Sequence, residues 1–254
     1  MAQHYAQHLE IMGQVHTARA PQGSPTAPPA AVPAPREPER ESVCLHGMTA
    51  RIGSDSLPAY DNEGPSRRLR LHGGRIARHP VHVAEFLAFM AAGGYRDRRH
   101  WSENGWRWLT RTGVEAPADW RRSDGGWHQV TDSGPRPLQP EQAVSGLSRH
   151  EAEAFARWAG ARLPHEYEWE AAHRAGLLDG VGQAWEWCAN AFHPYPGFQP
   201  FPYDGYSLPW FDGRHFTLRG ASPLTRTEIR RPSFRNFYQA HQRHFPAGLR
   251  LAWG

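Results

Sequence analysis

A proline-rich segment divides the chain into two unequal parts. Residues 21–41 carry seven prolines and no cluster of large apolar side chains. Proline fixes its own φ and lacks the amide hydrogen that helices and sheets use, so we expect a polyproline-like spacer here. The spacer leaves a short piece, residues 1–20, and a long piece, residues 42–254, in which a compact domain can form.

The short piece has the spacing of one helix. Leu9, Met12 and Val15 recur at a helical interval, and no proline or glycine precedes Gly13. An isolated helix of this length is only marginally stable in water, because no tertiary packing offsets the free-energy cost of helix nucleation.

Two histidines lie on one face of this expected helix. Residues 4–10 read HYAQHLE, so His4 and His8 are four residues apart, the spacing at which a helix can offer two imidazoles to one metal ion. On spacing alone, a histidine-rich chain end is the simpler explanation.

Composition excludes several classes of function. All of the 29 basic residues are arginine, the net charge is +4, and no basic run stands out, so we expect no nucleic-acid partner. Cys44 and Cys188 form neither a metal-ligand spacing nor a redox pair. No stretch reaches 18 consecutive apolar residues and no signal sequence is recognisable. We therefore expect a soluble, cytoplasmic protein without a membrane partner.

The long piece combines short helices with short strands. Ser148 and Glu151 form a capping box and Gly160 is a C-terminal stop signal. The three helices expected are at residues 82–92, 149–159 and 164–174. Residues 215–222 and 248–253 alternate apolar and polar side chains, as strands do. This mixture predicts an α+β domain.

An aromatic segment is the most informative part of this domain. Residues 192–216 hold nine Phe, Tyr or Trp residues, five prolines and three glycines, with no helical or strand periodicity. Irregular connections of this length are usually functional. Either the aromatic side chains pack on the domain, or Tyr203, Tyr206 and Trp210 line a pocket suited to a quaternary ammonium ion.

Several motifs, in order, resemble one known family. They are YDNEGP, IARHPV, EFLAFMAAGGY, HEAEAFARWAGARLP, EYEWEAA, GQAWEWCANAF with the tyrosine-rich segment, LRGAS, FRNFY and AGLRLA. Together they resemble the formylglycine-generating-enzyme (sulfatase-modifying-factor) domain, most of all its form in ergothioneine-pathway sulfoxide synthases. The resemblance covers about residues 42–254 and implies a C-type-lectin-like α+β fold.

The resemblance also gives the N-terminal histidines a role. Those synthases carry a DinB-like four-helix bundle whose last helix bears an H-x-x-x-H-x-E motif. By this resemblance residues 1–20 are one remnant helix of that bundle, and His4 and His8 are two of three ligands to non-haem Fe(II). Glu10 would orient a ligand. The third histidine would lie on an earlier helix that this chain lacks, so we expect poor iron retention without it.

The implied reaction joins a thiol to the imidazole carbon of N-trimethylhistidine, using O2 and Fe(II), and gives a sulfoxide. Gln7 and Asn236 would hydrogen-bond the trimethylhistidine, and Phe237 would face its ammonium group. Tyr203 would donate a proton or hydrogen, since a phenol stays protonated at neutral pH, and Tyr206 would contact substrate. The thiol or selenium donor stays open.

Each of these residues also has a purely structural interpretation. Tyr203 and Phe237 could pack in the core, and Asn236 could cap a turn. Trp185, Trp187, Arg219 and Arg235 are expected to be structural residues. Glu186 is expected to pair with an arginine.

Three functions follow as hypotheses. The first is a sulfoxide-synthase-type enzyme, incomplete unless the bundle with the third histidine comes from a separate chain or from a gene start placed too late. The second is a non-catalytic, lectin-like binding module or a degenerate relic of such an enzyme. A formylglycine-generating enzyme is disfavoured, because that activity needs a cysteine pair near the end of the domain and no cysteine follows Cys188.

Overall fold

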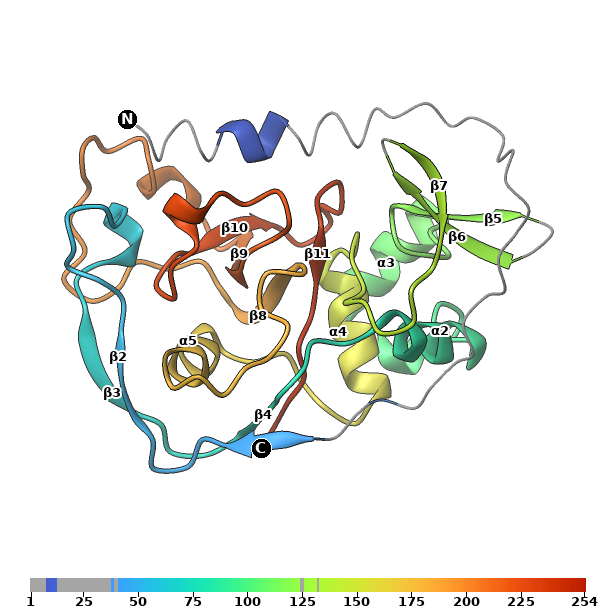
Figure 1. The fold of residues 1–254 in the computed structure, drawn as a ribbon, viewed down its shortest axis with the longest axis horizontal. Coiled ribbons are helices and arrows are strands. Elements are labelled where there is room, and N and C mark those ends of the chain that lie inside the picture. Colours follow the sequence, from blue (N-terminus) through green and yellow to red (C-terminus); the bar gives the residue numbers. More distant parts are fainter. Residues whose placement is uncertain (1–7, 13–37, 39–40, 124–125, 132) are drawn as a thin grey trace.

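The computed structural model describes residues 8–12, 38, 41–123, 126–131 and 133–254. The expectations for His4, Gln7 and most of the proline-rich segment therefore lie outside the described residues. Residues 8–12 are helical and lie above the strands of the central sheet, at the top of Figure 1.

The described residues form four sheets (Figure 1). The central sheet has the order β10-β9-β8-β11, and only β11 runs parallel to its neighbour. Its strands are β8 (Trp185–Ala191), β9 (His215–Gly220), β10 (Asn236–Gln239) and β11 (Ala247–Gly248). The second sheet joins both ends of the domain: β1 (Ser42–Cys44), β4 (Arg75–Ala77) and β12 (Ala252–Trp253). Two antiparallel sheets complete the set: β2 (Thr49–Ile52) with β3 (Arg67–Arg70), and β5 (Trp120–Ser123), β6 (Gly126–Thr131) and β7 (Gly134–Pro137).

The domain contains the three predicted helices and one that the sequence analysis did not predict. They are α2 (Val83–Ala91), α3 (Glu103–Thr112), α4 (Arg149–Trp158) and α5 (Glu166–Arg174). In α4, Ser148 Oγ accepts a hydrogen bond from Glu151 N at 3.2 Å, and Glu151 Oε2 accepts one from Ser148 N at 2.8 Å. The predicted capping box is therefore present.

The prediction of three helices in the domain was wrong, because it left out α3. Ser102 Oγ accepts a hydrogen bond from Gly105 N, and Gly113 ends the helix with φ +65°, a conformation that favours glycine. The sequence therefore contains both the N-terminal cap and the C-terminal stop of this helix, but Gly105 interrupts its apolar pattern. That glycine lies where a Cβ would come within 3.1 Å of Ser102 Oγ.

The core is aromatic and its charged groups are paired. Trp185 and Trp187 are fully buried, as predicted. The guanidinium of Arg250 donates to both carboxylate oxygens of Glu186, at 2.8 and 2.9 Å, which confirms the expected pairing of this glutamate. Arg219 bonds to Glu170 and Arg235 to Glu166 in the interior, so both arginines are structural.

Candidate functional site

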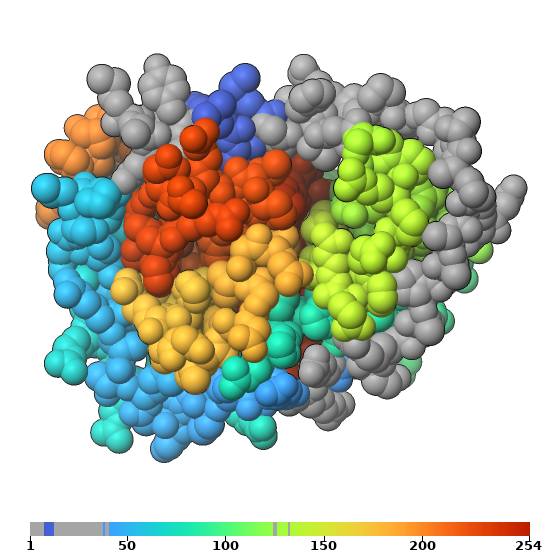
Figure 2. All heavy atoms as spheres, viewed as in Figure 1, coloured from blue at the N-terminus to red at the C-terminus, as the bar shows by residue number. Residues whose placement is uncertain are grey.

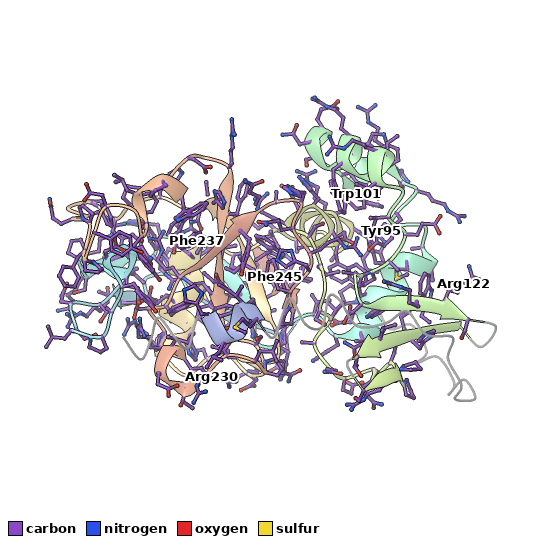
Figure 3. The ribbon with its side chains drawn as sticks, turned by 90° about the horizontal axis from the view of Figure 1, so that it is seen from above. Tyr95, Trp101, Arg122, Arg230, Phe237 and Phe245 are labelled. Carbon is purple, nitrogen blue, oxygen red and sulfur yellow. The ribbon has the colours of Figure 1, made fainter. Side chains whose placement is uncertain are left out.

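The helix at residues 8–12 is held to the domain by one buried carboxylate. Glu10 is 4% exposed. Its Oε1 accepts hydrogen bonds from Trp185 Nε1 at 2.6 Å, Ser222 Oγ at 2.9 Å and Thr225 Oγ1 at 2.8 Å. In Figure 3 the helix lies between the labels of Phe237, Phe245 and Arg230. We call the three donors, Trp185, Ser222 and Thr225, the Glu10 socket.

The socket is itself braced. Arg230 donates from Nε to the carbonyl oxygen of Thr225 at 2.7 Å and from Nη2 to that of Ser222 at 2.8 Å. Ser222 N also donates to Thr225 Oγ1 at 2.8 Å. Burial raises the pKa of the Tyr238 phenol on β10, and the negative charge of the Glu10 carboxylate raises it further. These bonds fix the backbone of the turn that carries the two hydroxyl donors of the socket.

Through these three hydrogen bonds Glu10 anchors the helix of residues 8–12 to the domain, and its expected role in orienting a metal ligand stays a prediction. His8, two residues earlier on this helix, is exposed. An iron centre of the implied kind needs several imidazole or carboxylate donors around one point. Among the residues described, no three His, Cys, Asp or Glu side chains come together in that way. Of the two iron ligands that the resemblance implies in this chain, His8 lies among the described residues and His4 does not.

The tyrosine-rich loop is held by the residues of the YDNEGP motif. Asp61 lies in a 3-10 turn, η1 (Asp61–Glu63), and its carboxylate accepts a short hydrogen bond from Ser207 Oγ and a longer one, 3.4 Å, from Phe201 N. Asn62 Nδ2 donates to Ser207 Oγ at 3.0 Å. Because Asp61 is buried, its pKa is raised. This motif anchors both ends of the segment that carries Tyr203 and Tyr206.

Tyr203 and Tyr206 differ in exposure and contacts. Tyr206 stacks on Tyr60, with ring centroids 4.7 Å apart and planes at 14°. Tyr203 meets Tyr206 edge to face at 6.4 Å and is 55% exposed. The interpretation of Tyr203 as a core residue was therefore wrong, since its ring lies on the surface.

The candidates on β10 lie in an aromatic group of their own. Phe237 stacks on Phe192 at 4.3 Å and lies 6.0 Å from Trp210. Asn236 Oδ1 accepts a hydrogen bond from Phe237 N at 3.0 Å, and Asn236 lies in a strand, so the turn-cap interpretation was wrong. Of the three aromatic residues expected to line one pocket, Tyr203 contacts Tyr206, whereas Trp210 contacts Phe237.

A chain of ring contacts joins the Glu10 socket to the tyrosine-rich loop. Trp185 lies 5.7 Å from Phe234, Phe234 lies 5.8 Å from Tyr60, and Tyr60 stacks on Tyr206. A change at the socket can therefore reach Tyr206 through direct packing.

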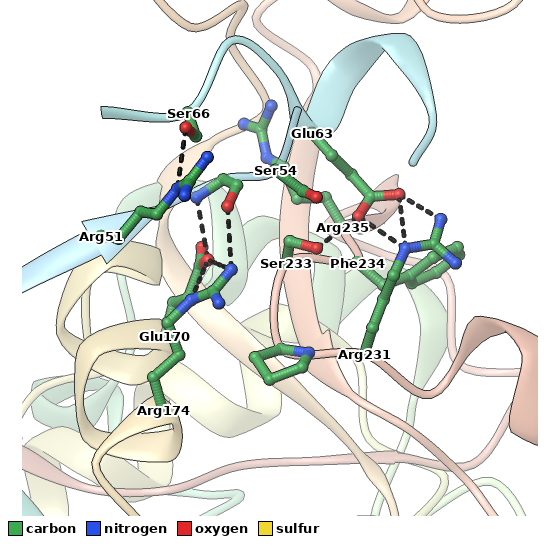
Figure 4. Close-up of polar contacts among 12 residues, drawn as sticks. Arg51, Ser54, Glu63, Ser66, Glu170, Arg174, Arg231, Ser233, Phe234 and Arg235 are labelled. Carbon is green, nitrogen blue, oxygen red and sulfur yellow. Dashed lines mark hydrogen bonds and ion pairs between the residues drawn. The ribbon is translucent and has the colours of Figure 1, made fainter. Parts of the chain in front are cut away.

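Glu63 is a site residue that sequence reasoning missed. Its carboxylate accepts hydrogen bonds from Arg231 and from Ser233 Oγ at 2.6 Å (Figure 4). It also accepts one from Tyr60 N at 2.9 Å. It thus joins the turn that holds the tyrosine-rich loop to the segment that leads into β10. Asp61, Ser222 and Thr225 were missed as well, and nothing in their local sequence distinguishes them from other polar loop residues.

The comparisons with known proteins agree with the fold. Residues 28–180 and 174–254 match the family model described as the sulfatase-modifying factor enzyme 1-like domain. A hercynine oxygenase of Mycobacterium tuberculosis is 34% identical over 244 residues, which cover 79% of this chain and 57% of that protein. A hercynine oxygenase of Mycolicibacterium thermoresistibile is also 34% identical, over 79% of this chain and 55% of that protein. The chain thus spans little more than half the length of these relatives.

A solved structure supports the same architecture. PvdO from Pseudomonas aeruginosa aligns with a TM-score of 0.56 at 18% identity, over 83% of this chain and 93% of its own. A mixed α/β domain with these sheets is a domain of the formylglycine-generating-enzyme class. The chain belongs to the sulfatase-modifying factor enzyme 1-like family. Of the helices described, none is long and apolar enough to cross a membrane.

Proposed function

We propose that this chain takes part in ergothioneine-type biosynthesis as a sulfoxide-synthase-like protein. The reaction would join a thiol to the imidazole carbon of N-trimethylhistidine with O2 and non-haem Fe(II). The observation that carries the proposal is the Glu10 socket, because it fixes the helix of His8 against the domain that bears Tyr206 and β10. Relatives named hercynine oxygenase support the same conclusion.

The roles proposed for this chain follow from the contacts of its side chains. Asn236 uses Oδ1 for the amide of Phe237, which leaves Nδ2 to donate to the imidazole of trimethylhistidine. Phe237 and Trp210 offer ring faces, which attract a quaternary ammonium group. The exposed phenol of Tyr203 would donate a proton or hydrogen, and Tyr206, fixed by Tyr60, would contact substrate.

The N-terminal residues complete the proposed site. His4 and His8 would supply two imidazoles to Fe(II), and Gln7 would hydrogen-bond the trimethylhistidine. The third histidine would come from a bundle, carried by a separate chain or by sequence outside this one. Iron, once bound, would activate O2, and Asn236, Phe237, Trp210 and Tyr206 would bind and orient the substrate.

A formylglycine-generating activity has less support. A protein of that name in Thermomonospora curvata is 35% identical over 162 residues, which cover 56% of this chain. The two cysteines of this chain are both free, Cys44 at the surface and Cys188 in the interior. Burial raises the pKa of the Cys188 thiol well above its usual value, so this thiol does not readily form the reactive thiolate.

The test combines substrate binding with product formation. The full chain, loaded with Fe(II) without oxygen, is supplied with trimethylhistidine, cysteine or γ-glutamylcysteine, and a candidate bundle chain; O2 uptake and the carbon–sulfur product are then measured. We expect binding of trimethylhistidine and product when a bundle is present. Tyr203→Phe should abolish product and keep binding, while Tyr167→Phe, a matched change away from the loop, should keep both binding and product.

Two other results would change the conclusion. Binding without product under every condition favours the lectin-like module. Absence of both binding and product overturns the proposal.

A further inference from the structure

A second candidate site lies at the other end of the molecule. A cavity of about 700 Å³ is bounded by α2, α3 and the β5–β6 hairpin, on the side of the domain away from β10 and the tyrosine-rich loop (Figures 1 and 3). In Figure 2 the hairpin region forms a separate body of the surface beside the central sheet. A cavity of this volume is within the range that holds small organic ligands.

The walls of the cavity suit a planar ring. Trp106 from α3 and Trp127 from β6 line it over a floor that includes the buried side chains of Leu87 and Leu109. Both tryptophans are only partly buried, and neither indole has a ring contact with another aromatic residue in the described part of the chain. Although both also pack against the core, each indole presents surface to the cavity that a ligand ring can contact.

Three arginines close to the cavity in sequence are each paired with a carboxylate. Arg98 and Arg107 pair with Glu103, and Arg99 pairs with Asp97.

Arg96, Arg122 and Glu115 line the cavity and are exposed. None of the three makes a side-chain hydrogen bond or an ion pair within the described ranges of the chain. Two guanidinium groups and one carboxylate give the cavity a net charge of +1, which complements one carboxylate better than a dianionic phosphate. A guanidinium also matches a carboxylate in geometry, through two parallel N–H donors.

We propose that this cavity binds a small planar aromatic carboxylate, separately from the proposed oxygenase site. Its ring would stack on Trp106 and Trp127, and its carboxylate would be held by Arg96 and Arg122. Glu115 would exclude ligands with a second negative charge.

The test uses indole-3-acetate as the probe and isothermal titration calorimetry of the full chain. We expect saturable binding at one site, weakened at least about tenfold in R96Q/R122Q, because each charge-assisted hydrogen bond contributes a factor of this order. Arg111→Gln, on α3 but outside the cavity lining, is the matched control and should leave the affinity unchanged. Circular dichroism and thermal melting of each variant check that the fold is intact.

Ligand series separate this proposal from general hydrophobic binding. Tryptamine and indole-3-acetamide share the ring and lack the carboxylate, so both should bind at least about tenfold more weakly than indole-3-acetate. Equal binding of tryptamine, an unchanged affinity in R96Q/R122Q, or no binding at millimolar probe overturns the proposal. Glu115→Gln should improve binding of a dicarboxylate such as phthalate; no improvement removes the role given to Glu115.

Discussion

Glu10 and Trp185 are 175 residues apart in the chain, and the carboxylate of one accepts the indole hydrogen of the other at 2.6 Å. This contact, with the hydroxyls of Ser222 and Thr225, is how a helix too short to be stable alone keeps a defined position. The helix depends on the domain for its structure, and the domain gains His8 at its surface.

Glu10→Ala should release the helix at residues 8–12. The substitution leaves Trp185, Ser222 and Thr225 as three donors without their acceptor, and each unsatisfied buried group costs about 1–3 kcal/mol. We expect faster hydrogen exchange of the amides at residues 8–12 and a lower melting temperature. Met12→Ala, an exposed change on the same helix, is the control and should alter stability by at most about 0.5 kcal/mol. Unchanged exchange in Glu10→Ala would contradict the anchoring role.

Glu186→Gln should be among the most destabilising single changes in the core. Glu186 accepts two hydrogen bonds from Arg250 and one from Trp169 Nε1 at 2.6 Å, and all three residues are buried. Removing the charge leaves Arg250 buried without a counter-ion, which costs about 3–5 kcal/mol. Urea unfolding measures the loss. In Glu103→Gln, which breaks exposed pairs, the loss should stay below about 1 kcal/mol, and a comparable loss in both variants would refute the argument.

The parts of the fold that depend on local signals could be predicted. The capping box of Ser148 and Glu151 fixes where α4 begins, and the alternation of residues 215–222 corresponds to β9. The helix α3 was missed because Gly105 and two tryptophans obscure a short amphipathic pattern, which packs against α4 and Trp101 in the folded domain.

The site was predictable to a smaller extent, because its contacts are distant in sequence. The resemblance named Tyr203, Tyr206, Asn236 and Phe237, and their roles stay predictions. Nothing local in YDNEGP shows that Asp61 holds Ser207, 146 residues away. For the same reason no pattern in the sequence marks the Glu10 socket, because Trp185 comes near Ser222 and Thr225 only when β8 pairs with β9.

Ser207→Ala should loosen the tyrosine-rich loop without unfolding the domain. Ser207 Oγ donates to Asp61 and accepts from Asn62, so its loss leaves two buried polar groups short of a partner, at a cost of about 1–3 kcal/mol. We expect faster hydrogen exchange at residues 200–210. Ser56→Ala, whose hydroxyl bonds only at the surface, is the control. Equal protection of the loop in Ser207→Ala and the native chain would show that ring packing alone holds it.

The protein should lose stability as the pH falls below about 6.5. Burial lowers the pKa of His150 to about 4, and it also lowers the pKa values of His165, His173 and His244. Since each folded pKa lies below the unfolded value of 6.5, the unfolded chain takes up protons first, and the free energy of unfolding falls as pH drops from about 6.5 toward 4. Above that window these histidines contribute no pH dependence.

His150 can be tested separately from the other three histidines. Its ring lies 5.4 Å from that of Trp108, and Arg149, Glu153 and His241 are the charged or titratable groups that act on it. Changing His150 to Gln removes one proton-binding group. The slope of the unfolding free energy against pH between 6.5 and 4 should therefore decrease by an amount that corresponds to at most about one proton taken up on unfolding. Urea unfolding at a series of pH values measures that slope, with His72→Gln, an exposed histidine, as the control. A slope that His150→Gln does not change would mean that the ring charges as easily in the folded protein as in the unfolded chain.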